Sequence, residues 1–383
     1  MNIGFDSKRI YENRSGLGNY GRTLVGLMAR NYTQHKFTLF APSQTALFDG
    51  SSYANIELIT PAGLMGRSFP AFWRRRWMVE DIRNSGVDIF HGLSNELPSG
   101  IERIRIKKVV TVHDIIYERF PDTYHWDERI VNRRKVKRAC EVADVIIAMS
   151  TQTKNDLIDL YNVPCEKIVV CHQSCNPAFQ EKTDSYALQK IKMKYHLPDN
   201  YFLFVSAITK RKNLITLCRA MSLLTGNSAI PLVVIGNGKK EKEEARRYMK
   251  DSGIEQLLIF LNEESVSGDG NFSSGTDLPA IFQQATALIY PSLYEGFGLP
   301  VLEALWSGLP VICSDSSSLP EVGGDAALYF SPLDHVTLAR HMTDIWVDRK
   351  KADEMRIKGY DQARFFAPEQ YATRMMQVYQ KLL

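Results

Sequence analysis

Two glutamates, Glu295 and Glu303, flank a segment rich in glycine and are the residues in this sequence best suited to chemistry. The segment reads Glu295-Gly296-Phe297-Gly298-Leu299-Pro300-Val301-Leu302-Glu303. Proline favours the first turn of a helix, where its missing N–H needs no partner, so a helix is predicted to begin near Pro300. The glycines before it can present backbone N–H groups to a diphosphate at the positive end of that helix. Glu303 can then accept hydrogen bonds from the two vicinal hydroxyls of a ribose. Glu295 can bind sugar hydroxyls or stabilise positive charge at a sugar carbon.

Three consecutive cations follow the apolar run Tyr201–Val205. The segment reads Ser206-Ala207-Ile208-Thr209-Lys210-Arg211-Lys212-Asn213. Lysine and arginine at the start of a helix can neutralise a diphosphate and stabilise it as it leaves. The alternative is a basic turn that faces solvent. No two aspartates stand two residues apart, so no Asp-x-Asp metal site is predicted, and these cations would take the place of a metal ion.

Two segments in the first half of the chain also follow predicted strands. They read Ser15-Gly16-Leu17-Gly18-Asn19-Tyr20-Gly21 and Thr111-Val112-His113-Asp114. The first is predicted to be a loop between the strand Asn2–Phe5 and the helix Thr23–Arg30, where glycines let backbone N–H groups approach a phosphate. A tight turn without a ligand explains it equally well. In the second, His113 can exchange a hydrogen bond with a sugar hydroxyl, and the alternative is a pair that caps a helix.

Short apolar runs alternate with helical patterns along the whole chain, which is typical of parallel sheets covered by helices. The predicted strands are Asn2–Phe5, Phe37–Phe40, Val87–Phe90, Val109–Val112, Val145–Ala148, Ile168–Val170, Tyr201–Val205, Leu232–Ile235, Leu258–Leu261, Ala287–Tyr290, Val311–Cys313 and Ala327–Phe330. The two blocks predict an α/β protein with two doubly wound, Rossmann-like domains that bind ligands at the carboxyl ends of their strands. The polar stretch 176–200 is predicted to be the linker, and the Gly/Ser/Asn-rich stretch 263–276 an exposed loop.

The composition fits a globular protein, with 383 residues, 44% of them hydrophobic and 23% charged. A net charge of +4 is too small to predict a nucleic-acid partner but suits acidic ligands. The six cysteines lack the spacing of a metal site and are predicted to be free thiols. The sequence shows no signal-peptide pattern and no apolar run near the roughly 18 residues of a membrane span, so a cytoplasmic protein is expected.

Two basic segments predict a peripheral contact with the anionic inner face of the cell membrane. They read Trp73-Arg74-Arg75-Arg76-Trp77 and Arg133-Arg134-Lys135-Val136-Lys137-Arg138. Cationic helices flanked by tryptophan can rest on anionic headgroups and place their rings at the interface. The alternative is a helix face that is simply solvated.

Taken together, these motifs resemble the family-4 glycosyltransferases, which have two Rossmann-like domains facing a cleft, the glycosyltransferase-B fold. The segment 295–303 is similar to the Glu-x7-Glu motif of that family, and 211–213 to its donor-phosphate motif. The resemblance extends to Ser15–Tyr20, Asp88–Gly92, Thr111–Asp114 and Leu319–Ala327. It implies an acceptor-binding domain at 1–180, a donor-binding domain at 190–365, and a C-terminal helix at 366–383 that packs back on the first domain.

Position by position, the resemblance implies that Glu295 and His113 are the catalytic residues and contact the transferred sugar. The donor-binding residues that it implies are Gly16, Gly18, Ser206, Arg211, Lys212, Phe297, Gly298, Leu299 and Glu303. Many members of the family carry an arginine at the position of Ala207. Arg211 or Lys210 would therefore have to supply the second cation for the diphosphate.

The function implied by the resemblance is that of a retaining glycosyltransferase that needs no metal or cofactor. It would transfer a hexose, with mannose from GDP-mannose as the leading candidate, to a saccharide or a lipid-linked oligosaccharide in cell-surface polysaccharide synthesis. The leaving phosphate would take the acceptor proton, so no nucleophilic side chain is assigned. The alternatives are a sugar-nucleotide epimerase of similar fold and a two-domain sugar-binding protein without activity. The sequence predicts no particular oligomeric state.

Overall fold

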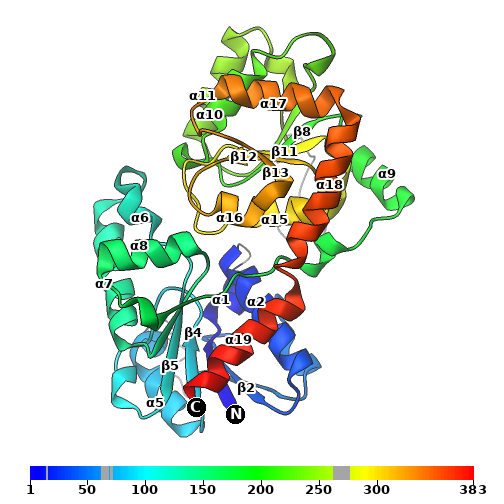
Figure 1. The fold of residues 1–383 in the computed structure, drawn as a ribbon. Helices are drawn as coiled ribbons and strands as arrows, with labels where there is room; N and C mark the ends of the chain where they lie inside the picture. The colour runs from blue at the N-terminus through cyan, green and yellow to red at the C-terminus, as the bar shows by residue number, and fades with distance from the viewer. Residues whose placement is uncertain (14–15, 62–68, 70–71, 262–276) are drawn as a thin grey trace. The chain divides into compact units, whose positions relative to one another are not determined.

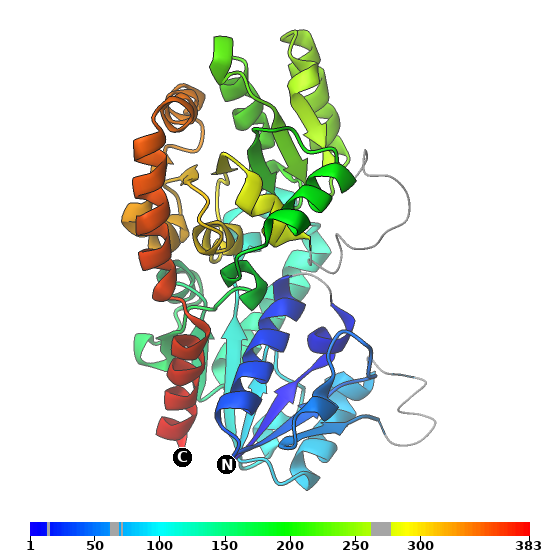
Figure 2. The same cartoon turned by 90° about the vertical axis from the view of Figure 1, so that its right-hand side faces the viewer.

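The computed structural model describes residues 1–383 apart from 14–15, 62–68, 70–71 and 262–276, so the predicted loop at 263–276 lies outside the described residues. The chain forms two compact units, each built around its own sheet (Figures 1 and 2). Unit 1 comprises Met1–Cys175 and Ala367–Leu383, and unit 2 comprises Asn176–Phe366. The predicted α/β class, with two Rossmann-like parallel sheets, is confirmed.

Unit 1 is organised around a seven-stranded parallel sheet with the order β3-β2-β1-β4-β5-β6-β7. Its strands are β1 (Asn2–Asp6), β2 (Lys36–Phe40), β3 (Ile56–Ile59), β4 (Ile89–Gly92), β5 (Lys107–Val112), β6 (Val145–Ala148) and β7 (Ile168–Val170). The central strands are almost entirely buried, as their continuous apolar runs predict. Strand β3 is not among the predicted strands, because this edge strand is half-exposed and Glu57 interrupts its apolar pattern.

Helices cover this sheet, and one of them comes from the far end of the sequence. The helices of unit 1 are α1 (Lys8–Glu12), α2 (Gly16–Asn31), α5 (Met78–Asn84), α6 (Ile116–Arg119), α7 (Trp126–Val142), α8 (Thr151–Tyr161) and α19 (Pro368–Leu382). Figure 1 shows α19 beside α2, and its buried face includes Tyr371, Met375 and Tyr379. Burial of this face ties the last helix of the chain to the first domain.

The glycine-rich segment that follows β1 is helical, which corrects the predicted loop at 15–21. Helix α2 begins at Gly16 instead of Thr23, so the glycines occupy its first turns. The cause is close packing: a Cβ on Gly18 would lie 1.8 Å from the backbone oxygen of Asn13, and one on Gly21 would lie 2.7 Å from Ile10. Glycine is therefore needed here to bring α2 against α1 and Asn13.

Unit 2 contains a six-stranded parallel sheet with the order β10-β9-β8-β11-β12-β13. Its strands are β8 (Phe202–Val205), β9 (Leu232–Ile235), β10 (Leu258–Phe260), β11 (Ala287–Tyr290), β12 (Val311–Ser314) and β13 (Ala327–Phe330). Its helices are α9 (Ser185–Lys194), α10 (Leu214–Met221), α11 (Lys240–Asp251), α14 (Leu278–Gln284), α15 (Leu299–Trp306), α16 (Leu319–Gly323), α17 (His335–Val347) and α18 (Arg349–Arg364). All twelve predicted strands of the chain overlap an observed one.

The predicted linker at 176–200 begins where the first segment of unit 1 ends, and its residues fold as part of unit 2. Asp184 caps the start of α9 by accepting a hydrogen bond from the backbone N–H of Ala187 at 2.9 Å. The end of α9 is held against α14, where Lys194 and the Tyr195 hydroxyl both bond Asp277, at 2.8 and 2.6 Å. The polar composition of the stretch thus reflects a half-exposed helix with capping and ion-pair residues.

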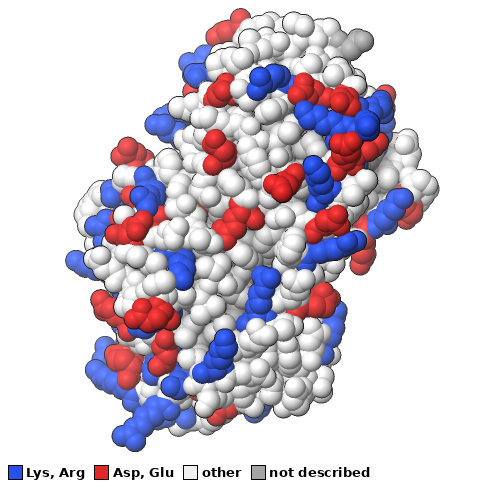
Figure 3. Space-filling model, viewed as in Figure 1, with Lys and Arg blue, Asp and Glu red and all other residues white. Residues whose placement is uncertain are grey.

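On the face drawn in Figure 3, acidic and basic side chains lie interspersed. This agrees with the small net charge of the chain. Within the described ranges, no helix combines the length and the apolar character needed to cross a bilayer.

Candidate active site

The two motifs of unit 2 meet at one edge of its sheet. The cation segment 206–213 follows β8, and the glutamate segment begins shortly after β11. These strands are distant in sequence but hydrogen-bonded neighbours in the sheet, with Leu288 opposite Leu203. Because the strands are parallel, both segments leave from the same edge, as expected for the ligand-binding end of an open α/β sheet.

The centre of this edge is a buried ion-pair cluster around Glu295. Lys212 Nζ lies 2.5 Å from Glu295 Oε1 and 2.8 Å from the Tyr290 hydroxyl. Arg211 Nη1 lies 3.2 Å from Glu295 Oε2 and also donates to the backbone oxygen of Tyr294. Lys212 and Glu295 are 9% and 6% exposed. The carboxylate predicted to face the sugar and the cations predicted to face the diphosphate therefore form one charged group.

The charge of Glu295 is set by its partners. Burial opposes ionisation, but Lys212 and Arg211 outweigh it and lower the pKa of Glu295 to about 2. Glu295 is therefore a carboxylate at neutral pH. A buried charge of this kind is tolerated because both cations and nearby hydrogen-bond donors compensate for its lost hydration.

Asn213 fixes the turn that carries the cations. Its backbone adopts the left-handed conformation, with φ of +59°, which asparagine tolerates better than most residues. Its side-chain amide donates to the backbone oxygens of Pro291 and Pro332, at 3.0 and 2.7 Å. The turn at Lys212 is thereby fastened to the loop after β11, which explains why Lys212 can reach Glu295.

Two serines hold the loop of Glu295 from the other side. The backbone N–H of Glu295 donates to the Ser317 hydroxyl at 2.8 Å. The Ser318 hydroxyl donates to the backbone oxygens of Glu295 and Phe297, at 3.0 and 2.8 Å. These serines and Tyr290 are not among the predicted site residues. Tyr290 could have been found as the last residue of a predicted strand, whereas the serines carry no signal before the fold is known.

Helix α15 begins directly after this loop, as Pro300 predicts. Gly298 precedes the helix with φ of +108°, a conformation that disfavours any side chain, and a Cβ there would lie 2.7 Å from Leu319. Glu303 lies within α15 and is partly buried. Burial raises the pKa of Glu303 to about 8, so this carboxyl is mostly protonated at pH 7 in the structure.

Most of the predicted donor-binding residues are thus brought together in unit 2. They are Ser206, Arg211, Lys212, Phe297, Gly298, Leu299 and Glu303, with Glu295 among them. Ser206 follows directly after β8 and is partly buried beside this group. Ala207, which replaces the arginine common in the family, is exposed beside them. Of the two cations proposed to compensate, Arg211 lies in the cluster, whereas Lys210 is exposed.

His113 lies in unit 1, at the carboxyl end of β5. Its Nε2 lies 2.8 Å from the backbone oxygen of Leu93, which can only accept, so Nε2 carries the proton and Nδ1 is an acceptor. The ring contacts Tyr20 edge to face, with 4.6 Å between the centroids. Burial and the charge of Arg9 lower the pKa of His113 to about 4, although its bond to Leu93 opposes this shift. His113 is therefore a neutral hydrogen-bond acceptor at pH 7.

A buried polar network supports the strand that carries His113. His91 bonds the Tyr379 hydroxyl at 2.7 Å and the Thr111 hydroxyl at 2.8 Å. The hydroxyls of Thr111 and Tyr20 lie 2.8 Å apart. Burial, with a smaller contribution from His113, lowers the pKa of His91 to about 3, so His91 is neutral. The network joins β4, β5, α2 and α19 beside the candidate residue.

Gly16 and Gly18, the other predicted donor-binding residues of unit 1, lie in the first turns of α2. Gly16 is exposed at the first helical position, where a backbone N–H has no partner within the helix. The N–H of Gly18 donates to the Asn13 side chain at 3.3 Å. Gly16 thus keeps the geometry expected of an anion-binding N–H, while Gly18 serves the packing of the helix.

In the basic segment 73–77, Trp73 and Arg74 face the interior of unit 1, so these two side chains are not offered to a membrane. Trp73 is buried, and its indole N–H donates to Asp81 at 2.7 Å. Arg74 points inward and pairs with Asp6 at 2.7 Å and Glu96 at 2.5 Å. The segment is a π-helical turn whose aromatic and cationic residues partly serve the interior of unit 1.

The second basic segment, 133–138, lies on α7 and is more exposed. Arg133 pairs with Glu118, Lys135 lies 3.3 Å from Glu96, and Val136 is buried against the core. The same helix carries the exposed apolar residues Trp126, Ile130 and Val131. Helix α7 therefore carries both the basic and the exposed apolar side chains that a membrane contact requires.

Two protein families match this chain, and the break between the two matches lies near the boundary between unit 1 and unit 2. A family described as "Glycosyltransferase Family 4" matches residues 14–179, and one described as "Glycosyl transferases group 1" matches residues 189–362. The chain is 29% identical over 313 residues to O-antigen chain mannosyltransferase B of Escherichia coli, covering 81% of this chain and 77% of that protein. It is 27% identical over 292 residues to the Escherichia coli serotype-specific mannosyltransferase WbdA, covering 73% of this chain and 34% of that longer protein.

Solved structures agree with the fold. The crystal structure of Anabaena Alr3699/HepE in complex with UDP superimposes with a TM-score of 0.75 at 16% identity, covering all of both chains. A glycosyltransferase from Rickettsia africae superimposes with a TM-score of 0.74 at 15% identity, covering 100% of this chain and 98% of that one. At these identities the likeness concerns the fold.

Proposed function

We propose that this chain transfers mannose from GDP-mannose to a saccharide or lipid-linked acceptor. The chain belongs to the family-4 glycosyltransferases and is a hexosyltransferase. The proposal of mannose rests on the names of its relatives, which are mannosyltransferases of O-antigen synthesis. We accordingly place the reaction in the synthesis of a cell-surface polysaccharide, at the cytoplasmic face of the membrane. The acceptor would be supplied by the reaction that adds the preceding sugar.

The observation that carries the proposal is the buried cluster of Lys212, Arg211 and Glu295 beside the first turn of α15. Lys212 and Arg211 would bind the donor diphosphate, together with backbone N–H groups of the loop at 297–299. Negative charge grows on the diphosphate as the bond to the sugar breaks, and fixed cations stabilise it without reorganisation. Glu303 would bind the ribose hydroxyls, and Ser206, at the end of β8, would contact the donor.

Glu295 would contact the transferred sugar. Its low pKa keeps it ionised, so it can accept hydrogen bonds from sugar hydroxyls and stabilise positive charge at the anomeric carbon. The acceptor oxygen would bond to that carbon on the face from which the diphosphate departs, and the departing phosphate oxygen would take the acceptor proton. The anomeric configuration is then retained. The step requires no nucleophilic side chain, and we propose that it requires no metal ion.

On unit 1, we propose that His113 contacts the transferred sugar and that Gly16 offers its backbone N–H to the diphosphate, whereas the N–H of Gly18 is already bonded to Asn13. Nδ1 of His113 can accept a hydrogen bond from a sugar hydroxyl because its Nε2–H is committed to Leu93. The first turn of α2 would add backbone N–H groups near the diphosphate. The buried network of His91 and Thr111 would hold these elements in place.

The decisive test is transfer from radiolabelled GDP-mannose to membrane-extracted acceptor, with UDP-glucose and UDP-galactose as competing donors. We expect a mannosylated product with the α-configuration of the donor, formed equally well in the presence of EDTA. Transfer from a uridine nucleotide alone would overturn the assignment of GDP-mannose, and loss of activity in EDTA would overturn the metal-free reaction. An epimerase would convert the donor without acceptor, and a binding protein would form no product at all.

We also propose that α7 rests on the anionic inner leaflet during the reaction. Trp126 is 72% exposed, and Ile130 lies one turn further along the same helix. The arginines and lysines between 129 and 138 add attraction to anionic headgroups. Apolar and basic residues on one helix are the pattern expected of a peripheral membrane contact.

A further inference from the structure

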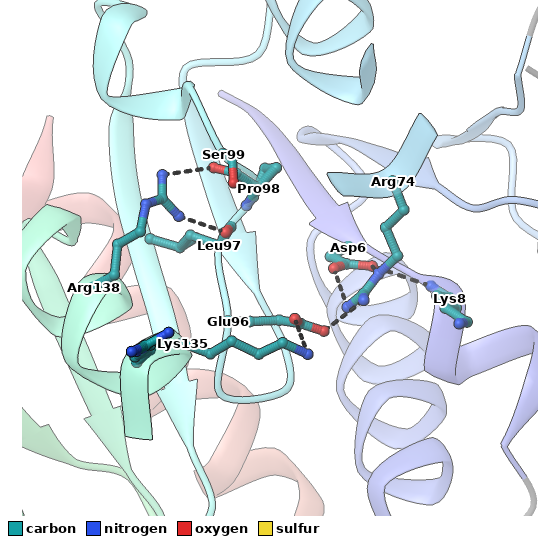
Figure 4. Close-up of a pocket in the computed structure, with 10 residues that line it drawn as sticks. Asp6, Lys8, Arg74, Glu96, Leu97, Pro98, Ser99, Lys135 and Arg138 are labelled. Carbon is teal, nitrogen blue, oxygen red and sulfur yellow. Dashed lines mark hydrogen bonds and ion pairs between the residues drawn. The ribbon is translucent and has the colours of Figure 1, made fainter. Parts of the chain in front are cut away.

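Unit 1 contains a charged pocket that the proposed donor site does not use (Figure 4). It has a volume of about 380 Å³, which falls within the range of pockets that hold a sugar or another small molecule. Its lining residues are Asp6, Lys8, Arg74, Glu96, Leu97, Pro98, Ser99, Arg134, Lys135 and Arg138. It lies where β1 ends and beyond the end of β4, which is the ligand-binding edge of the unit 1 sheet.

One wall of the pocket is a fixed ion-pair group. Arg74 bridges Asp6, at the last position of β1, and Glu96, in the loop after β4. Asp6 is 4% exposed, so this arginine is held by buried geometry. Burial opposes the charge of Glu96, but Arg74 and Lys135 outweigh it and lower its pKa. Asp6 and Glu96 each offer acceptor lone pairs beyond those that Arg74 uses.

Arg138 belongs to the opposite wall and is also fixed. Its guanidinium donates to the backbone oxygens of Leu97 and Pro98, at 2.9 and 3.1 Å, and to Glu102 at 2.7 Å. Ser99 follows these residues in the same loop and adds a hydroxyl to the pocket. The loop that lines the pocket is thus anchored to α7.

The remaining cations are less committed. Lys8 lies 3.8 Å from the Glu12 carboxylate, a loose pair at the surface. Lys135 is exposed and lies 3.3 Å from Glu96. Arg134 is exposed and has no ion-pair partner among the residues that the structure describes. The lining therefore carries five cationic side chains against two carboxylates, and three of the cations can turn toward a ligand.

We propose that this pocket binds a saccharide that carries a phosphate or a carboxylate, and that this saccharide is the acidic part of the acceptor. The excess of cations selects an anion, and paired cations bind phosphate or carboxylate strongly. Asp6, Glu96 and Ser99 would accept or exchange hydrogen bonds with the hydroxyls of the sugar. No aromatic side chain is among the described residues that line the pocket, so a stacked nucleobase is not favoured. The assignment as acceptor rests on the proposed function.

The test is calorimetric titration of the whole protein with mannose 6-phosphate, glucuronate and neutral mannose, in the presence of saturating GDP. GDP occupies the proposed donor site, so the probes report on the pocket of unit 1. We expect the two acidic sugars to bind at least about tenfold more tightly than mannose, the equivalent of one charge-assisted hydrogen bond. The stronger of the two identifies the acidic group as phosphate or carboxylate. Equal binding of mannose would overturn the proposal.

Substitutions of the lining residues test whether the acidic sugar binds in this pocket. Arg134→Gln is expected to weaken binding of the acidic sugar by about tenfold. The double variant with Lys8→Gln is expected to weaken it further, because each change removes a charge-assisted contact. Lys137→Gln is the matched control, since Lys137 is exposed on the same helix but does not line the pocket. Wild-type affinity in the Arg134/Lys8 double variant would overturn the proposal. Affinity that depends on Arg134, in a protein that transfers no sugar, would keep the binding site and reject only the proposed function.

Discussion

The lysine at 212 serves two partners if the proposed function holds, because the side chain that would bind phosphate already compensates a buried carboxylate. Removing it should therefore affect both stability and binding. Lys212→Met leaves Glu295 with Arg211 alone, and we expect a loss of about 3 kcal/mol in the free energy of unfolding. Adding Glu295→Gln should restore much of that stability, measured by urea denaturation.

Nucleotide affinity should not recover in the same way. We expect Lys212→Met and the double variant with Glu295→Gln both to bind GDP at least about tenfold more weakly, because each lacks the same phosphate contact. Lys210→Met is the control, since Lys210 is exposed and outside the cluster. Full GDP affinity in the stable double variant would remove Lys212 from the donor site.

Because the pKa of Glu303 is raised, the stability of the folded protein should depend on pH. The pKa rises from an ordinary value of 4.5 to about 8 because of burial. Between these values the folded protein keeps a proton that the unfolded chain releases, so the carboxyl lowers stability as pH increases. Glu303→Gln keeps the neutral shape at every pH. Its Tm should match that of the native protein near pH 4.5 and exceed it increasingly up to about pH 8.

Thermal denaturation across that range checks this prediction. Glu244→Gln, a change on the exposed side of α11, should give a Tm difference that does not grow with pH. A constant difference for Glu303→Gln would mean that burial does not hold the proton on this carboxyl. A growing difference would also predict that nucleotide binding, which needs the ionised form to accept ribose hydroxyls, releases a proton near neutral pH.

At the residue scale, the sequence identified Glu295 and Lys212 separately but could not reveal that they touch. Their contact depends on β8 and β11 being neighbours, although two strands of the sheet come between them in sequence. Residue types and spacing indicate chemistry, whereas the strand order decides which motifs meet. Tyr290 joins them for the same reason.

At the scale of elements, the start of α2 shows how glycine can be misinterpreted. Gly16 and Gly18 look alike in sequence, but an added Cβ meets no described atom within 4 Å at Gly16 and lies 1.8 Å from a backbone oxygen at Gly18. A local pattern cannot tell a phosphate-binding loop from a close helix contact. The turn at Asn13 and its approach to α2 become visible only in three dimensions.

This difference gives a matched pair of substitutions. We expect Gly18→Ala to lower the free energy of unfolding by more than about 2 kcal/mol, because the backbone of Asn13 must move. Gly16→Ala should be neutral or raise stability by up to about 1 kcal/mol, since alanine favours the helix. Chemical denaturation distinguishes them, and equal effects would mean that the close contact at Gly18 does not constrain the helix.

The predicted linker at 176–200 contains a helix that its composition does not reveal. Its polar residues include Asp184, which caps α9, and Lys194, which pairs with Asp277. Polar composition predicts exposure correctly, but exposure is compatible with a helix as well as with a loop. Strand positions were easier to predict, because buried parallel strands are marked by continuous apolar runs whose length limits the alternatives.

For the whole molecule, the exposed apolar residues of α7 predict behaviour toward membranes. Trp126→Ser should reduce sedimentation with vesicles of phosphatidylglycerol at least about threefold, because the indole no longer enters the interface. Vesicles of phosphatidylcholine should bind little of either protein, since they lack the anionic charge. Tyr186→Ser is the control, because Tyr186 is 80% exposed on α9 of unit 2. Unchanged binding in Trp126→Ser would exclude α7 as the contact.

The return of α19 to unit 1 has a consequence for how the protein is made. Unit 2 lies wholly between the two sequence segments of unit 1, so a ribosome delivers all of unit 2 before α19 emerges. Until then, the Tyr379 partner of His91 is missing, and the apolar surface of α2 that α19 covers remains open. Unit 2 can therefore complete its fold first, while the nascent unit 1 keeps apolar surface exposed until its last helix is synthesised.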